Sequence, residues 1–417
     1  MTDQPYRALH ICRLCGGGDL THYVDFGEVP LGNNLQENAD AARRAATYPL
    51  VLNRCDTCSH FQLGHAVAPE LLYATNYTYL SGIGLSFVKH FAEYADWAAT
   101  RLDLAPGSLV VDVGSNDGTA LKPFQAQGHR VFGVDPASLP ASIANDNGVE
   151  TLNAFFDEAA VDEILRRHGQ ADFVTSHNVL AHVDDLAAVF RNIHRLLRDG
   201  GWFAFEIGYF REVLRTGCFD TTYHEHLDYH HAAPLVRHLT ALGFDVVDLS
   251  VNAVQGGSLR LLLRKTGEGG VSASARAFLE EERGSVLYDP EFLAGWKAMI
   301  EGTMAAFGDA VRQRRAAGKR VVAYGAPTKA TLLLQMAHLT ASEIAMVVDD
   351  NPHKVGRFLP GSAVPIRATS ELDRDVPDVI VVLAWNFADD IYGKLRGRFP
   401  KTVEMLTPLP NLRSVLL

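Results

Sequence analysis

The middle of the chain alternates between short apolar runs and segments whose apolar residues recur at helical spacing. Four runs have the length and character of buried strands, at residues 108–113, 130–135, 171–176 and 202–207. Residues 190–197 carry apolar side chains with a period of about 3.6, and Gly200 and Gly201 are expected to end this helix. Apolar strands that alternate with helices predict a doubly wound, largely parallel sheet.

The last third of the chain repeats this plan. Between residues 272 and 317 the apolar positions follow a helical period, with a break near Asp289 and Pro290. Three apolar runs then predict strands separated by helices, at residues 320–324, 344–351 and 378–386. We therefore predict a second Rossmann-like α/β domain, related to the first as a degenerate duplication.

Composition narrows the classes of function. The 417 residues are 47% hydrophobic and carry a net charge of −11, so real cores can form but the basic balance of a nucleic-acid-binding protein is absent. No apolar run reaches the ~18 residues of a membrane span, and no secretory signal is visible at the start. We expect a cytoplasmic protein with no nucleic-acid or membrane partner and with reduced cysteines.

Four of the five cysteines form two Cys-x-x-Cys pairs, Cys12 with Cys15 and Cys55 with Cys58. Each pair can offer two thiolates to one tetrahedral ion, and four thiolates leave no position for water. The pairs therefore predict a structural zinc ion. Redox-active dithiols are the alternative, although neither pair stands in a visible strand–helix unit.

A loop with two glycines follows the first apolar run of the middle region, at residues 112–118. Its Asp-x-Gly-x-x-x-Gly spacing resembles motif I of class I S-adenosylmethionine methyltransferases. It differs from the Gly-x-Gly-x-x-Gly of dinucleotide-binding loops, and a nicotinamide-binding domain is the alternative. Glycines allow the backbone to approach a ligand closely. We predict that this loop binds S-adenosylmethionine through Asp112, Gly114, Asn116 and Gly118.

Three further positions complete the predicted cofactor site. Asp135 ends the second apolar run, where a carboxylate can accept hydrogen bonds from both ribose hydroxyls. Phe155 lies in residues 151–156, a segment expected to carry side chains to the adenine. Asn178 follows the run at 171–176 and should lie at the same edge of the sheet.

Titratable side chains gather in residues 223–231, a run that contains Tyr223, Glu225 and His226. The run follows the cofactor region, and ligands of open α/β sheets bind at the carboxyl edge of the strands. His182 ends a loop on that edge and is expected to donate a hydrogen bond. A metal site is one alternative, but the His-Glu-x-x-His spacing is absent; a solvated histidine-rich loop is another.

Five motifs together resemble those of the three-domain, zinc-containing sugar C-methyltransferases of deoxysugar biosynthesis. They are the two cysteine pairs, the loop at 112–118, Asn178-x-x-Ala181-His182, Tyr223-x-Glu225-His226 and Gly325-Ala326-Pro327-Thr328-Lys329. The resemblance covers nearly the whole chain and implies methyl transfer from S-adenosylmethionine to a nucleotide-linked 4-keto-6-deoxyhexose. On this basis we expect a zinc-binding domain at residues 1–72, a methyltransferase domain at 73–267 and a sugar-nucleotide-binding α/β domain at 268–417.

The resemblance also implies roles for individual residues. In that family the equivalent of His226 is taken as the general base, and the sugar pocket is lined by the equivalents of Glu225, Tyr223, His182 and an inter-domain tyrosine. That tyrosine is Tyr77 or Tyr79 here; we favour Tyr79 for the catalytic cluster and assign Tyr77 to the substrate contacts.

The loop at residues 325–329 can act as a diphosphate cradle, because backbone amides at a helix N-terminus and a nearby lysine attract phosphate. We predict substrate contacts from Gly325, Lys329 and Asn386. A purely architectural C-terminal domain is the alternative.

Carbon methylation by a sulfonium requires a carbanion, which a carbon beside a ketone can provide as an enolate. The α-proton has a pKa of roughly 20 against about 6.5 for imidazole, a gap of about 18 kcal/mol. Donors aimed at the enolate oxygen must therefore supply much of the stabilisation. Glu225 either holds the imidazole tautomer or binds a sugar hydroxyl. Because C3 and C5 both flank the C4 ketone, the methylated carbon stays open, as do the nucleobase and the oligomeric state.

Two other functions fit the same motifs. In an O- or N-methyltransferase acting on another metabolite, His226 would deprotonate a hydroxyl. A non-catalytic protein could use the zinc and nucleotide domains for assembly. Exchange of a sugar α-proton with solvent distinguishes carbon methylation from O- or N-methylation, because only carbon methylation passes through an enolate.

Overall fold

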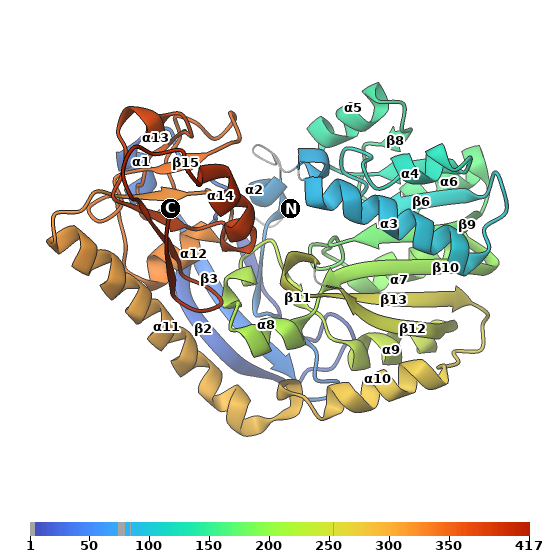
Figure 1. The fold of residues 1–417 in the computed structure, drawn as a ribbon. Coiled ribbons are helices and arrows are strands. Elements are labelled where there is room, and N and C mark those ends of the chain that lie inside the picture. The colour runs from blue at the N-terminus through green and yellow to red at the C-terminus, as the bar shows by residue number, and fades with distance from the viewer. Residues whose placement is uncertain (1–4, 74–79, 84, 253) are drawn as a thin grey trace.

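The computed structural model describes residues 5–73, 80–83, 85–252 and 254–417. The described residues form four sheets, of two, four, seven and six strands. Figure 1 shows the two larger sheets in opposite halves of the molecule, with the long strands β2 (Leu20–Pro30) and β3 (Thr47–Cys55) between them. The class is α/β with two Rossmann-like units, as the sequence predicts.

The seven-stranded sheet, called the middle sheet below, is the first predicted doubly wound unit. Five neighbouring strands pair in parallel, and a hairpin of two strands is added antiparallel at one edge. In spatial order the strands are β12 (Phe244–Asn252), β13 (Ser258–Lys265), β10 (Leu197–Gly208), β9 (Ala171–His177), β6 (Leu109–Val113), β7 (Arg130–Val134) and β8 (Thr151–Leu152).

Helices cover both faces of the middle sheet, which explains why its central strands are apolar throughout. Val111 packs with α6 (Glu158–His168) and α7 (Leu186–Leu196), whereas its neighbour Val110 packs with α3 (Leu85–Leu102) and α4 (Lys122–Ala126). Successive strand residues point to opposite faces, so each strand contributes to two cores. Three more helices surround this region, α5 (Ser138–Asp146), α8 (Phe210–Thr216) and α9 (Ala232–Ala241).

One predicted boundary is displaced. The helix expected at residues 190–197 begins earlier, after Asp185, whose side chain caps its first turn. Strand β10 then starts at Leu197 and continues through Gly200 and Gly201 with a shift of register. The two glycines therefore lie in a bulge of the strand rather than at the end of the helix, because Leu197 is already paired with β9.

The six-stranded sheet, called the C-terminal sheet, is the second Rossmann-like unit. Its order is β16 (Ile366–Ala368), β15 (Val347–Asp349), β14 (Val321–Tyr324), β17 (Val379–Val382), β18 (Glu404–Thr407) and β19 (Arg413–Leu416). All neighbours are parallel except the last pair. The helices around it are α12 (Ala330–Met336), α13 (Glu371–Arg374) and α14 (Ala388–Leu395).

Two helices connect the middle and C-terminal sheets, α10 (Ala273–Arg283) and α11 (Pro290–Ala316). The predicted break between them is confirmed: Asp289 caps α11 through its side chain, and Pro290 occupies the first helical turn. In Figure 1 these helices run along one side of the molecule, α10 below the middle sheet and α11 below the C-terminal sheet.

The N-terminal sheet contains a strand from the middle of the chain. Its order is β11 (Asp228–Tyr229), β4 (Phe61–Leu63), β3 and β2, and β1 (Tyr6–Ala8) pairs separately with β5 (His65–Val67). β11 is antiparallel to β4, and Asp228 lies opposite Gln62. Because β11 begins two residues after His226, the cysteine-containing region and the predicted catalytic run share one sheet. Short helices α1 (Ala39–Arg43) and α2 (Pro69–Tyr73) complete the region.

Among the described residues, no helix combines the length and the apolar character needed to cross a membrane.

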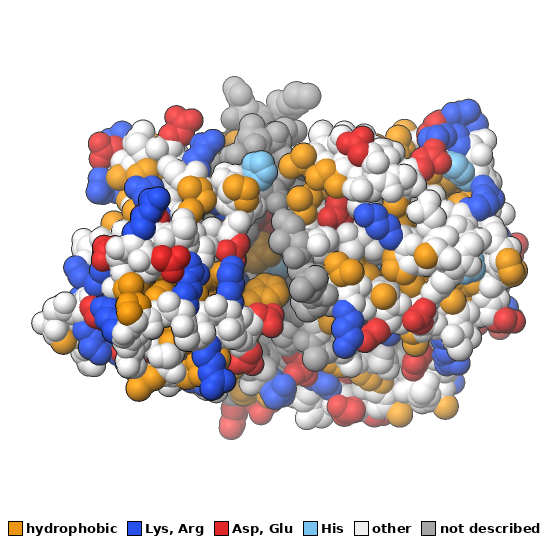
Figure 2. Space-filling view, turned by 45° about the horizontal axis from the view of Figure 1, so that its top comes forward, with side chains coloured by type: hydrophobic (Ala, Val, Ile, Leu, Met, Phe, Trp, Pro, Cys, Tyr) orange, Lys and Arg blue, Asp and Glu red, His pale blue; other side chains and the backbone are white. Residues whose placement is uncertain are grey.

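On the face shown in Figure 2, acidic and basic side chains are interspersed over both halves of the molecule. Hydrophobic side chains are visible in the hollow between the halves.

Candidate active site and metal centre

The four paired cysteines lie together. The sulfur atoms of Cys12, Cys15, Cys55 and Cys58 are all within 4.8 Å of one another. Sγ of Cys12 is 3.7 Å from that of Cys58, and Sγ of Cys15 is 3.7 Å from that of Cys55. Four sulfurs at about 2.3 Å around a tetrahedral zinc would be about 3.8 Å apart. The geometry fits a structural zinc ion with four thiolate ligands.

Each knuckle is closed by backbone hydrogen bonds. The Cys12 N–H donates to the Gly17 carbonyl at 2.7 Å, and the Cys55 N–H donates to the His60 carbonyl at 2.8 Å. Gly16 supplies a φ of 75° to the first turn, a conformation that glycine adopts without strain. The turns direct both thiolates of each pair toward the same point.

A cavity of about 530 Å³ opens at the carboxyl ends of β6, β7 and β9. Side chains from all three predicted domains line it, with Asn33 from the first and Thr328 from the third. Five of the seven predicted cofactor residues also line it, namely Gly114, Asn116, Asp135, Phe155 and Asn178. The cavity therefore joins the cofactor loop to the predicted catalytic run.

Gly114 and Asp135 form a cradle that fits a nucleoside. Gly114 has a φ of 75°, and a Cβ on it would lie 2.2 Å from a methyl of Val179, so a side chain is excluded. The Asp135 carboxylate accepts hydrogen bonds from the N–H groups of Asn116 and Ala137, each at 2.8 Å. Each carboxylate oxygen keeps a second lone pair for a ribose hydroxyl. Burial raises the pKa of Asp135, and the two N–H donors oppose that rise.

Two side chains border this cradle. Phe155 stands at the cavity with 59% of its surface exposed, so its ring is accessible to a planar base. Asn178 has a φ of 56°, and its N–H donates to the Glu206 carbonyl at 2.7 Å. This turn ends β9 and carries Asn178 to the cavity wall.

Asp112 and Gly118 do not line the cavity. Asp112 is buried, one of its oxygens has no hydrogen-bond partner among the described residues, and burial raises its pKa well above the usual range. Gly118 has a φ of 77°, and a Cβ on it would meet Val149 at 3.0 Å. In this structure the two residues lie on the side of the loop that faces the protein interior rather than the cavity, and they support its conformation.

The imidazole of His226 is held in one tautomer by a carbonyl. Its Nδ1–H donates to the Thr221 carbonyl oxygen at 2.8 Å, which leaves the lone pair on Nε2. The Tyr223 hydroxyl donates to that Nε2, also at 2.8 Å. Burial and the neighbouring His182 lower the pKa of His226 well below its usual value, so the ring is neutral. Orientation by Glu225, one of the two roles expected for it, is thus performed by Thr221.

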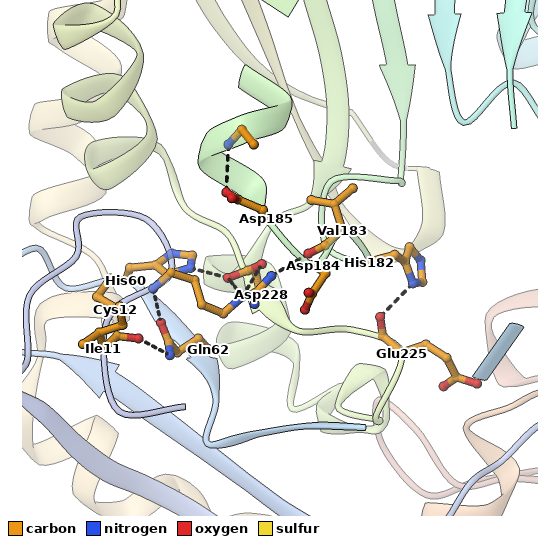
Figure 3. Close-up of polar contacts among 12 residues, drawn as sticks. Ile11, Cys12, His60, Gln62, His182, Val183, Asp184, Asp185, Glu225 and Asp228 are labelled. Atoms are coloured by element: carbon orange, nitrogen blue, oxygen red, sulfur yellow. Dashed lines mark hydrogen bonds and ion pairs between the residues drawn. The ribbon is translucent and has the colours of Figure 1, made fainter. Parts of the chain in front are cut away.

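His182 lies beside His226, with ring centroids 4.7 Å apart and the rings edge to face. Its Nδ1–H donates to the backbone carbonyl of Glu225 at 2.8 Å, as Figure 3 shows. Burial lowers the pKa of His182 to about 4. In this neutral tautomer Nε2 carries the lone pair and can only accept a hydrogen bond, whereas the sequence predicts a donor at His182. Donation from Nε2 requires a protonated ring.

Glu225 is a buried carboxyl at the cavity wall. Its Oε1 accepts a hydrogen bond from Asn33 Nδ2 at 3.1 Å, and its Oε2 has no partner among the described residues. Burial raises the pKa of Glu225 to about 7. Asn33 Oδ1 in turn accepts from the Thr328 hydroxyl at 2.8 Å. Asn33 is not among the residues predicted from the sequence, because no local motif distinguishes it from its neighbour Asn34.

The predicted diphosphate residues are not among those that line the cavity. Nζ of Lys329 is 3.5 Å from a carboxylate oxygen of Asp220 and 4.0 Å from the ring centroid of Trp385. Gly325 packs against Ala384, where a Cβ would be 2.5 Å from that alanine's Cβ. Asn386 is exposed in the turn that follows β17. Thr328 of the same loop does reach the cavity.

The two candidate tyrosines of the inter-domain segment, Tyr77 and Tyr79, lie outside the described residues. The choice between them therefore stays a prediction.

Three family models match the chain in sequence order. Residues 12–73 match the model described as "Putative zinc binding domain". Residues 88–249 match a methyltransferase domain, and residues 253–410 match the C-methyltransferase C-terminal domain.

One curated protein is similar to this chain over nearly the whole length of both. C-methyltransferase NovU of Streptomyces niveus is 34% identical over 410 residues, which cover 98% of this chain and 97% of that protein. The ubiquinone biosynthesis O-methyltransferase of Pseudomonas aeruginosa (strain UCBPP-PA14) is 32% identical over 108 residues, 25% of this chain and 46% of that enzyme. The second similarity is thus partial.

Among solved structures, magnesium protoporphyrin IX methyltransferase from Synechocystis PCC 6803 with bound SAM has 16% sequence identity and a TM-score of 0.34. The alignment covers 43% of this chain and 79% of that one. The full-length similarity to NovU and the ordered family models carry the assignment. This chain belongs to the family of zinc-containing, S-adenosylmethionine-dependent C-methyltransferases.

Proposed function

We propose that this enzyme methylates a carbon beside the 4-keto group of a nucleotide-diphosphate-linked 4-keto-6-deoxysugar, through an enolate, with His226 as the general base. One observation carries the proposal: the cavity that holds the cofactor loop also holds a neutral imidazole whose lone pair is fixed on Nε2. NovU, named as a C-methyltransferase, supports a carbon acceptor.

The cofactor supplies an electrophilic methyl group on a sulfonium. Gly114, Asn116, Asp135, Phe155 and Asn178 would hold it, because they line the cavity and provide a backbone cradle, a ribose acceptor and an aromatic face. Asp112 and Gly118 would act on it through the shape of the loop.

A neutral His226 can accept the α-proton only where Nε2 is accessible. In the structure the Tyr223 hydroxyl donates to that atom. A substrate carbonyl that attracts this O–H would uncover the lone pair and gain a donor on the oxygen that becomes the enolate. The two events favour each other, since proton removal increases the negative charge on the oxygen.

Glu225 is suited to the same oxygen or to a sugar hydroxyl. With its pKa raised to about 7, a large part of Glu225 is protonated near neutral pH and can donate. His182 accepts in its neutral tautomer, so a sugar hydroxyl is its natural partner. We retain Tyr79 as a further member of this catalytic group and Tyr77 as a substrate contact.

We assign nucleotide binding to residues 268–417, next to a methyltransferase domain at 73–267 and a zinc-binding domain at 1–72. The support is Thr328, through which the loop of the C-terminal domain reaches the cavity. Gly325, Lys329 and Asn386 remain the proposed diphosphate contacts. Lys329 already pairs with the buried Asp220, so phosphate would have to compete with that carboxylate.

The test uses purified enzyme, S-adenosylhomocysteine and a panel of nucleotide-linked 4-ketosugars in deuterated buffer. Mass spectrometry should show uptake of one deuterium at a carbon beside the ketone. With S-adenosylmethionine, NMR should locate the new methyl group on that carbon. Transfer to oxygen or nitrogen without exchange would replace the proposal with the O- or N-methyltransferase alternative.

A further inference from the structure

Arg13 extends from the zinc knuckle into the catalytic region. It stands between the ligands Cys12 and Cys15, yet its Nε lies 3.1 Å from both carboxylate oxygens of Asp228. Its Nη2 also donates to the backbone carbonyl of Val183. The Arg13 side chain is 6% exposed and that of Asp228 is 0% exposed, so the contact is enclosed by protein.

The two partners of Arg13 belong to the two catalytic segments. Val183 directly follows His182, and Asp228 is the second residue after His226. The segments also touch each other through the Leu227 N–H, which donates to the Ala181 carbonyl at 2.7 Å. In Figure 3, Asp228, Val183 and His182 lie between Cys12 on one side and the Glu225 side chain on the other.

The backbone of the Cys12–Cys15 knuckle is itself held in place by hydrogen bonds to a neighbouring strand. Gln62 of β4 accepts a hydrogen bond from the Arg13 N–H at 2.8 Å and donates to the Ile11 carbonyl at 3.1 Å. β4 is the strand that pairs with β11, and His60 before it donates to Asp228 at 2.9 Å. The backbone of Arg13 is thus held by Gln62 next to the cysteine cluster. Its guanidinium binds two acceptors, the Asp228 carboxylate and the Val183 carbonyl, in the segments that follow His226 and His182.

We propose that Arg13 is a positioning residue through which the zinc knuckle sets the relative placement of the His182 and His226 segments. A guanidinium can bind a carboxylate with one edge and a carbonyl with another, because its N–H groups form a rigid planar fork. A lysine offers a compact charge without that fork. The inference rests on the proposed catalytic roles of the two histidines, but the placement itself can be measured without substrate.

The experiment compares Arg13→Ala with Arg7→Ala. Arg7 also joins the N-terminal region to the loop after His182, through Asp184, but in an exposed pair. For Arg13→Ala we expect one zinc per chain, S-adenosylmethionine affinity within threefold of wild type and kcat lowered at least tenfold. Added guanidinium should restore kcat, whereas methylammonium should not. Arg7→Ala should match wild type.

Histidine ring NMR on selectively labelled protein provides the readout independent of turnover. The His182 and His226 signals should move in Arg13→Ala and return with guanidinium. If no ketosugar is turned over by wild type, these signals still test the placement while the proposed function fails. If Arg13→Ala does not fold, Arg13→Lys and Asp228→Asn report on the same contact from both sides. Unchanged ring signals together with unchanged kcat, or a loss that guanidinium does not restore, would overturn the proposal.

Discussion

The Nδ1–H of His226 donates to the backbone carbonyl of Thr221 at 2.8 Å. A backbone carbonyl is always an acceptor, so this contact leaves the neutral ring with its lone pair on Nε2. The cavity side of the ring is therefore basic, although burial lowers the pKa of His226 well below its usual value. A low pKa keeps the base unprotonated near neutral pH.

Replacement of His226 should strongly slow proton abstraction but leave cofactor binding intact. We expect His226→Asn to lower α-proton exchange by about 10²–10⁴-fold, the usual contribution of a general base. Calorimetry should show S-adenosylmethionine affinity close to wild type. His224→Asn is the comparison, because His224 is buried and contacts the Tyr48 carbonyl rather than the cavity. Wild-type exchange in the His226 variant would show that another residue is the base.

Asp135→Ala should weaken S-adenosylmethionine binding by at least about 1.5 kcal/mol, since hydrogen bonds to a charged group contribute on that scale. Isothermal titration measures the change directly. Asp112→Asn should cost less, because Asp112 does not line the cavity. Asp162→Asn, in an exposed pair with Arg195, serves as a control. Equal affinity for Asp135→Ala and wild type would remove Asp135 from the cofactor site.

Glu225 should make the fold less stable as pH rises toward neutrality. Burial raises its pKa in the folded state to about 7, from about 4.5 for a free glutamate side chain. The folded state thus keeps a proton that the unfolded state releases. The resulting stabilisation is complete below about pH 4 and is lost as pH rises to about 7. Its full size is about 3 kcal/mol, on the scale of 1.36 kcal/mol per pKa unit.

Urea titrations at pH 5 and pH 8 isolate this contribution when wild type is compared with Glu225→Gln. The variant should lose the part of the pH dependence that Glu225 provides. His182 and His226 contribute with the opposite sign in both proteins, because their lowered pKa values favour the folded state as pH rises. Identical pH dependence in both proteins would contradict a raised pKa for Glu225.

Loss of a zinc ligand should destabilise the protein rather than alter one chemical step. Cys15→Ser should lower zinc content below one per chain and reduce the melting temperature, because metal binding is coupled to folding. Cys218→Ser is the matched control: Cys218 is buried but stands apart from the cluster. Metal analysis and calorimetry check both variants. Full zinc content in Cys15→Ser would argue against four-thiolate ligation.

Asn33 should matter more for the sugar nucleotide than for the cofactor. Asn33→Ala removes the bridge between Glu225 and Thr328, which we expect to lower kcat/KM for the ketosugar about tenfold or more. Affinity for S-adenosylmethionine should change little. Asn34→Ala tests the neighbouring exposed amide. Equal losses in both variants, or none in Asn33→Ala, would dismiss a specific role for the bridge.

Much of this molecule follows from local sequence. Apolar runs separated by amphipathic segments predict both large sheets, because strands covered on two faces must be apolar throughout. The cysteine pairs and the loop after β6 are also local, since a knuckle or a turn is built from consecutive residues. The placement of Gly114, Asn116 and Asp135 at one cavity follows from parallel strands ending at a common edge.

Other parts of the site depend on contacts between distant residues. β11 has two residues, too few to show a period, and it is a strand because β4 pairs with it. Asn33 contacts Glu225 although the two are 192 residues apart in the chain. Arg13 contacts Asp228, which is 215 residues further along the chain. Lys329 was predicted for phosphate from its loop, but tertiary packing places Asp220 beside it.

The sequence by itself determined the architecture, the metal ligands and the residue types that gather at the cofactor edge, because periodicity and short motifs are properties of neighbouring residues. The tertiary structure alone decided which nitrogen of His182 and of His226 carries a lone pair, how Glu225 is buried and which partners bind Arg13 and Lys329. These properties depend on the position of single carbonyls and carboxylates. Their distances are fixed only when separate segments pack together.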